Sequence, residues 1–110
     1  RSFISLFLTP HMQELINTLN DQEGVNINED RIIELDLDKW ELENDYYPKF
    51  TNTVITGENA VLVIEKDMRT GNTRVSLIIG DQEDYYSTLV TYANIQVIED
   101  TIYIALGDEV

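Results

Sequence analysis

The side chains best suited to chemistry are carboxylates gathered in one stretch of the chain. Residues 29–45 contain eight acids, two bases and the chain's one tryptophan, Trp40. Glu34, Asp36 and Asp38 alternate with apolar residues, which on a strand places successive carboxylates about 6.6 Å apart on one face. Carboxylates in such an array can hold a metal ion, work as an acid–base pair, or bind a positively charged surface.

The first two kinds of chemistry lack the residues they need. An EF-hand loop opening at Asp36 requires an oxygen ligand and then glycine where this chain has Trp40 and Glu41. A glycosidase pair also needs a sugar cleft and one carboxyl group with a raised pKa. The single histidine, His11, falls in the first turn of a predicted helix, an exposed place, and no catalytic motif supports it. We therefore predict no enzymatic activity, no metal site and no cofactor.

The charge itself is the more informative feature. Twenty-one acids against seven bases give a net charge of −14 and a pI near 4.1. Such a chain repels nucleic acid and anionic membranes and attracts basic surfaces. A row of carboxylates can compete with the phosphates of nucleic acid for a surface that binds them. The predicted partner-binding residues are Glu34, Asp36, Asp38, Glu41, Glu43 and Asp45, flanked by Tyr46 and Tyr47.

In size and composition the chain is similar to small acidic inhibitors made by phages and mobile elements, and to immunity proteins that cap nuclease toxins. This similarity of kind assigns no residues. The resulting hypothesis is a binding protein that blocks a basic, nucleic-acid-binding surface of another protein, with no direct nucleic-acid or membrane contact. The alternative is a small structural subunit of a phage particle or homo-oligomer, whose acids are only solvated strand faces. The absence of cysteine and of a long apolar run favours a cytoplasmic location.

The elements that must position these residues are a helix and several strands. Thr9 and Pro10 are typical of a helix start, and an apolar stripe follows at helical spacing, consisting of Met12, Leu15, Ile16 and Leu19. Gly24 suits a left-handed position after the helix. The apolar residues 3–8 are expected to be paired or buried. In residues 29–45 the alternation slips at Lys39, which indicates either one strand with a bulge near Asp38 and Lys39, our preferred interpretation, or two short strands.

The rest of the chain is predicted to be largely strands. Residues 50–56, 60–64 and 75–79 form an antiparallel meander, in which the apolar run 60–64 is a central strand covered on both faces. Residues 85–93 are ambiguous and are assigned to a strand. Residues 96–98 and 101–106 form a closing hairpin. The predicted fold is therefore α+β, a single domain over residues 1–110 with one N-terminal helix packed on a mostly antiparallel five- to seven-stranded sheet.

Overall fold

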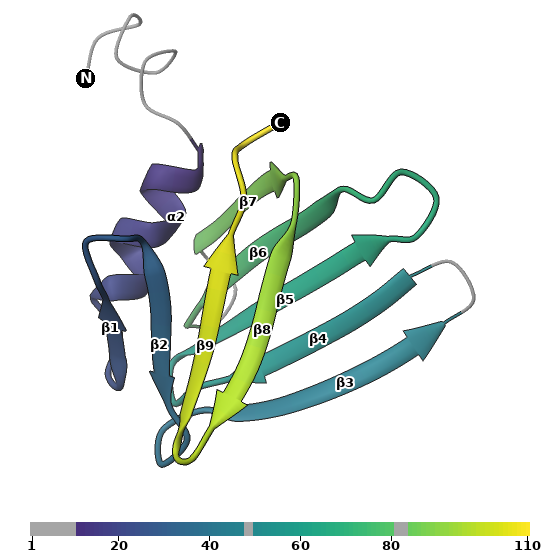
Figure 1. Ribbon diagram of the computed structural model, residues 1–110. Helices are drawn as coiled ribbons and strands as arrows, with labels where there is room; N and C mark the ends of the chain where they lie inside the picture. Colours follow the sequence, from purple (N-terminus) through teal and green to yellow (C-terminus); the bar gives the residue numbers. More distant parts are fainter. Residues whose placement is uncertain (1–10, 48–49, 81–83) are drawn as a thin grey trace, which may run out of the picture.

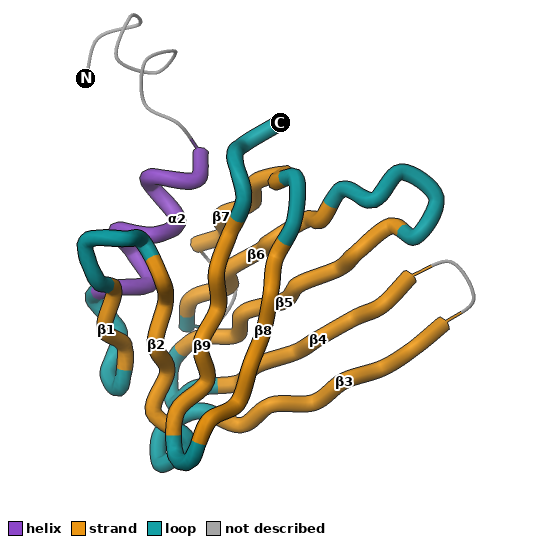
Figure 2. The backbone as a smooth tube through the Cα atoms, viewed as in Figure 1, coloured by secondary structure: helices purple, strands orange, loops and turns teal. Residues whose placement is uncertain are grey.

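The protein combines one helix with two antiparallel sheets in a computed structural model that describes residues 11–47, 50–80 and 84–110. The backbone alone is described for residues 45–47 and 50. Figures 1 and 2 show the two sheets facing each other with their strands crossing, and the helix beside them at one side. The α+β class is confirmed. No helix in these ranges is long and apolar enough to span a membrane.

The helix, α2, spans His11–Asn20 and buries the stripe that its sequence predicts. Met12, Leu15, Ile16 and Leu19 are all buried, and the helix contacts β1 (Val25–Ile27), β6 (Thr73–Ile79) and β7 (Asp84–Val90). Beyond the helix end, Gly24 has a φ of 78°, the left-handed conformation expected for it. The predicted start at Thr9 and Pro10, and the apolar residues 3–8, lie outside the described residues.

The smaller sheet has four strands in the order β1-β2-β9-β8. Besides β1 it contains β2 (Ile32–Asp36), β8 (Ala93–Ile98) and β9 (Thr101–Leu106), so the predicted closing hairpin is confirmed. Leu35 pairs with Ile102 and Ile33 with Ile104 across the centre, and all four side chains are fully buried. Because side chains alternate along a strand, Glu34 and Asp36 take the opposite, outward face.

The larger sheet is a five-stranded meander in the order β3-β4-β5-β6-β7. β3 spans Glu41–Tyr47, β4 spans Phe50–Thr56 and β5 spans Ala60–Asp67, so the predicted meander gains a strand on each side. Ile55, Leu62 and Leu77 pair in one row across the sheet, and all three are fully buried. Residues 85–93, assigned to a strand with little to decide it, are confirmed as strand up to Val90.

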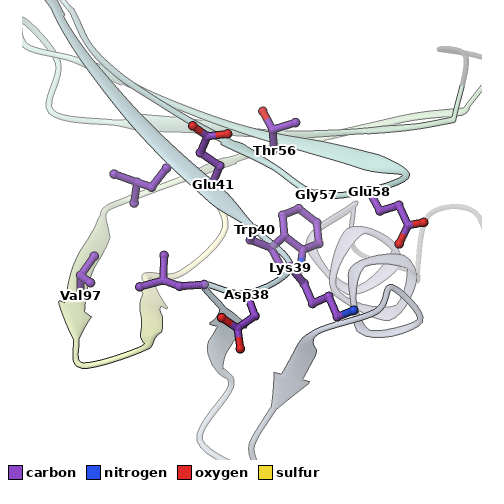
Figure 3. A pocket seen from close by; sticks show the side chains of 10 residues that line it. Asp38, Lys39, Trp40, Glu41, Thr56, Gly57, Glu58 and Val97 are labelled. Atoms are coloured by element: carbon purple, nitrogen blue, oxygen red, sulfur yellow. The ribbon is translucent and has the colours of Figure 1, made fainter.

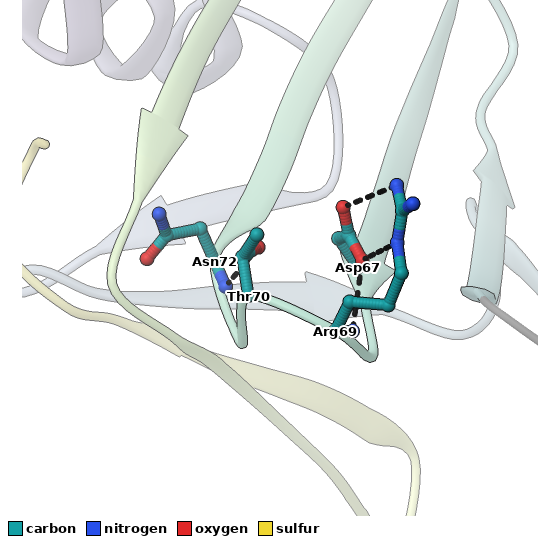
Figure 4. Close-up of polar contacts among 4 residues, drawn as sticks. All are labelled: Asp67, Arg69, Thr70 and Asn72. Carbon is teal, nitrogen blue, oxygen red and sulfur yellow. Dashed lines mark hydrogen bonds and ion pairs between the residues drawn. The ribbon is translucent and has the colours of Figure 1, made fainter.

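A tight turn joins β5 to β6. In the β5–β6 turn, shown in Figure 4, the Asp67 carboxylate accepts a hydrogen bond of 2.9 Å from the backbone N–H of Arg69. The Arg69 guanidinium lies 3.4 Å from the same carboxylate. Gly71 completes the turn with a φ of 79°, which a residue with a side chain rarely adopts.

The prediction of a single sheet with five to seven strands is wrong. The described residues form nine strands in two sheets, because residues 29–45 divide into β2 and β3 instead of forming one bulged strand. The Asp36 carboxylate accepts the Asp38 N–H at 2.9 Å, and the Asp36 carbonyl accepts the Lys39 and Trp40 N–H groups at 2.9 Å each. These bonds close a turn that sends β3 into the other sheet. The alternative of two short strands is confirmed.

The predicted coverage of β5 on both faces is also wrong. β5 is the central strand of the larger sheet, but its side chains alternate between buried and half-buried. Ala60, Leu62 and Ile64 enter the core, while Val61 and Val63 turn to the outward face. Valine and isoleucine favour a pleated strand even where burial is incomplete, so a continuous apolar run did not require cover on both faces.

Candidate protein-binding site

The predicted acidic residues are divided between two places. Glu34 and Asp36 lie on the outward face of β2, whereas Asp38 lies in the turn that follows and does not continue their row. Glu41 and Glu43 are exposed on β3, the edge strand of the larger sheet. For Asp45, Tyr46 and Tyr47 the structure describes only the backbone, which pairs with β4.

Glu34 and Asp36 share a surface hollow with a third acid. A hollow of about 350 Å³ is lined by Glu34, Asp36 and Asp100, together with uncharged residues of β1, its preceding turn and β9. Asp100 belongs to the β8–β9 turn, and it arrives here because Asp36 pairs with Thr101. The described residues of the lining include no base, and none of the three carboxylates forms an ion pair with a described base. This arrangement concentrates negative charge on one face, which can attract a cationic group.

Sequence reasoning missed Asp100. It falls in the connection of the predicted closing hairpin, and β2, the strand that brings it to the hollow, lies far from it in the sequence. Asp100 could have been found by pairing β2 with β9, since apolar residues alternate with polar ones in both strands and the apolar residues face each other across the pair. Nothing local to Asp100 specifies that pairing.

A larger groove opens on the other side of the β2–β3 turn. It has a volume of about 880 Å³ and combines apolar side chains with acids (Figure 3), and its lining includes Leu37, Trp40, Leu42 and Val97 as well as Asp38, Glu41 and Glu58. The groove brings together the β2–β3 turn, the start of β3, the β4–β5 turn and the edge strand β8. Such a mixture suits a ligand with both apolar and basic groups.

Lys39, the one base among the described residues that line this groove, is already paired. Lys39 Nζ lies 3.0 Å from a Glu23 carboxylate oxygen. The hydrogen bond and the charge of Glu23 raise the pKa of Lys39 above its ordinary value, so the ammonium stays charged and held by Glu23. Asp38, Glu41 and Glu58 have no ion pair with a base in the described ranges. The groove therefore keeps a negative rim.

Trp40 holds the floor of the groove in place. Its side chain is 3% exposed, and its indole N–H donates a hydrogen bond of 2.9 Å to the Glu23 carbonyl. A Cβ added at Gly57 would lie 2.9 Å from the indole ring carbons, so the ring packs directly on that backbone. The indole thus joins the turn after α2 to the β4–β5 turn.

A separate polar cluster lies on the outward face of the larger sheet. Arg74 donates a hydrogen bond of 2.9 Å to Ser87, and Ser76 lies 3.4 Å from both Ser87 and the Tyr85 hydroxyl. Hydrogen bonds with Ser76 and Ser87 hold the pKa of Tyr85 below its ordinary value. No hydrogen bond joins these hydroxyls to an imidazole or carboxylate among the described residues, so the serines lack the base that activates a nucleophile.

The remaining predicted features fall in ordinary surroundings. His11 is exposed at the start of α2. Tyr85 is 62% exposed while its neighbour Tyr86 packs against the core, as expected for adjacent tyrosines on a strand. Over the described ranges, no three His, Asp or Glu side chains are placed to hold a metal ion. Comparisons with protein-family models, curated proteins and solved structures found no match to this chain.

Proposed function

We propose that this is a non-enzymatic binding protein whose acidic face docks on a basic surface of another protein. That surface normally binds nucleic acid, and docking blocks it. The proposal covers an inhibitor from a phage or mobile element as well as an immunity protein. The observation that carries it is the hollow lined by Glu34, Asp36 and Asp100, with no base among its described lining residues, in a chain of net charge −14.

Electrostatics explains why such a face can displace nucleic acid. A phosphate-binding surface gains affinity by releasing counterions when its Lys and Arg side chains contact a regular array of charge. Glu34 and Asp36 are held on a strand about 6.6 Å apart, and pairing with β9 adds the carboxylate of Asp100 at the end of that row. A rigid array has less conformational entropy to lose on binding than a flexible acidic tail. The complex should form quickly and weaken steeply with salt.

The test uses isosteric neutralisation, because Asp36 also closes the β2–β3 turn. Glu34→Gln, Asp36→Asn and Asp100→Asn together remove three charges and keep a side-chain oxygen at each position. The control replaces Asp21, Asp84 and Asp108 by asparagine, since these acids are exposed and do not line the hollow. Both variants carry the same net charge, so any difference between them reports position.

The immobilised proteins are incubated with extract of the cells that encode them and are then eluted with duplex DNA. Wild type and the control variant should release the same basic nucleic-acid-binding protein into the DNA eluate, and the neutralised variant should not retain it. A second elution uses 0.5 M NaCl, about ten times the salt concentration of a low-salt buffer. The proposal would be contradicted if the bound protein were eluted neither by DNA nor by this salt.

A second candidate function, a structural subunit, is favoured by the outward face of the larger sheet. The register there places Val54 beside Val63, and Val61 beside Ile78, all half-buried, with Tyr85 at the edge. An apolar sheet face of this kind can pack on another copy or on a larger particle. Light scattering that shows an oligomer, dissolved by Val63→Lys, would favour this function over the inhibitor.

A further inference from the structure

The outer edge of β8 differs from that of β3, an edge strand of the larger sheet. β8 ends the four-stranded sheet and, among the described residues, pairs with β9 alone. Its sequence, ANIQVI, contains no charge and no proline, and Val97 and Ile98 are 51% and 53% exposed. An uncharged edge of this kind offers backbone N–H and C=O groups to another extended chain.

The edge strand β3 is protected in the usual way. Glu41 and Glu43 are exposed along it at alternate positions, so a strand of another acidic chain would meet carboxylates. The two edges therefore have different properties within one molecule. β3 repels a second copy of this chain, and β8 lacks such a barrier.

The groove of about 880 Å³ lies beside the open edge. Val97 of β8 lines it, together with Leu37 and Leu42 on the apolar side. Asp38, Glu41 and Glu58 form its negative rim. The described lining adds no unpaired base to this rim, because Lys39 is held by Glu23. An extended segment that paired with β8 would place every second side chain toward this groove.

We propose that the β8 edge and this groove bind an extended segment of the basic partner, which adds a strand to the four-stranded sheet. One apolar side chain of the segment packs on Val97 and Leu42. Lys or Arg residues two positions away, on the same face, reach the rim carboxylates Asp38, Glu41 and Glu58. This inference rests on the proposed function for the basic character of the partner, and it adds how that partner is held.

Charge selects this occupant over a second copy of the chain. Each copy carries a net charge of −14, and pairing two β8 edges would bring two acidic rims together. A basic segment instead neutralises the rim while it covers the exposed Val97. Backbone pairing supplies binding that is independent of sequence, and the groove supplies the preference for an apolar residue between basic ones.

The test uses a defined probe, the blocked peptide Thr-Lys-Thr-Val-Thr-Lys-Thr, which presents Lys, Val and Lys on one face of a strand. The matched control replaces both lysines by glutamate. NMR titration should shift the backbone amides of β8 and the Val97 methyl groups with the lysine peptide and not with the glutamate peptide. No shift of these signals at about 1 mM lysine peptide would overturn the proposal.

Two pairs of variants locate the contact. Glu41→Gln should weaken peptide binding by about two- to five-fold, and Glu43→Gln on the same strand, which does not line the groove, should leave it unchanged. Val97→Lys should weaken binding by about ten-fold, whereas Asn20→Lys, the same charge change at the exposed last residue of α2, should have little effect. Equal effects within either pair would contradict the groove.

The same variants distinguish a failure of the proposed function from a failure of the β8-edge inference. Suppose that the groove variants no longer bind the partner, while the variant neutralised at Glu34, Asp36 and Asp100 still binds it. The groove is then the binding site, and the acidic hollow is not. If the reverse holds, the partner docks on the hollow and the β8 edge is not its site. A dimer without peptide that Val97→Lys dissociates would show that a second copy occupies the edge, which overturns the proposal.

Discussion

Trp40 is the residue on which the geometry of the groove most depends. Its indole is buried between the turn after α2 and the β4–β5 turn, and its N–H satisfies the Glu23 carbonyl. The sequence identifies Trp40 as a core residue through its apolar alternation with Leu42. It does not identify Glu23 or Gly57 as its neighbours, because both contacts depend on how distant turns meet.

Replacing Trp40 by phenylalanine should lower the free energy of unfolding by about 1–3 kcal/mol, since the Glu23 carbonyl loses its donor and part of the ring volume is lost. Urea unfolding followed by far-UV circular dichroism measures the change, because the variant has no tryptophan fluorescence. Tyr92→Phe, at a side chain 48% exposed, is the control and should change stability little. A loss below 0.5 kcal/mol, about the scatter of surface substitutions, would refute the role given to the indole.

At the level of elements, the helix and the local hairpins could be predicted and the two-sheet arrangement could not. The stripe of α2 and the turns at residues 57–59 and 68–72 are specified by residues close in sequence. The division of residues 29–45 is decided partly by the bond of the Leu37 N–H to the Asp100 carbonyl at 2.9 Å, a contact between distant segments. The same pairing brings Asp100 to the predicted acids, which explains why Glu34 and Asp36 were foreseeable and Asp100 was not.

Asp36 and Asp38 should contribute unequally to stability, because the side chain of Asp36 alone accepts a described hydrogen bond in the β2–β3 turn. Asp36→Ala should lower the free energy of unfolding by about 1 kcal/mol, because the Asp38 N–H loses its acceptor. Asp38→Ala removes the same charge from the same turn and no described hydrogen bond of its side chain, so it should be close to neutral. Chemical denaturation of both variants, with Asp36→Asn as the rescue, tests the turn. Equal effects of the two alanine substitutions would favour a bulged strand instead.

The stabilisation that Asp67 contributes in the β5–β6 turn should depend on pH. The Arg69 backbone N–H is the main cause that holds the pKa of Asp67 below its ordinary value of 3.8. Because the folded-state pKa is the lower one, the stabilisation is present above pH 3.8 and is lost as the pH falls through the folded-state pKa. Asp67→Ala should therefore destabilise the protein at pH 6, and its difference from wild type should shrink in acid. Unfolding of both proteins across this range tests it, and a difference that grows in acid would contradict the sign.

At the scale of the whole molecule, charge has opposite effects on folding and on binding. The ion pairs between described residues are Lys39 with Glu23 and Arg69 with Asp67, and the net charge of −14 is what remains after all seven bases are counted. Self-repulsion destabilises the folded state, and salt screens it. Salt equally screens attraction to a basic partner. If the acidic face served only for solubility, salt would stabilise the folded state but would have no partner binding to weaken.

Raising NaCl at pH 7 from a few millimolar to about 0.5 M should raise the melting temperature by a few degrees, because the Debye length falls below the spacing of surface acids. Differential scanning calorimetry measures this, and sucrose at matched osmolality is the control for effects other than screening. An unchanged or lower melting temperature in salt would show that self-repulsion is not a significant cost for this fold.

The most direct measurement of the central claim compares the two variants that have lost three charges in different places. Calorimetric titration of the DNA-eluted partner at low salt gives each affinity. We predict that neutralising Glu34, Asp36 and Asp100 weakens binding by about ten-fold or more, while neutralising Asp21, Asp84 and Asp108 changes it by less than about two-fold. Equal losses for the two variants would show that net charge alone attracts the partner, and that the face formed by β2 and the β8–β9 turn is not the binding site.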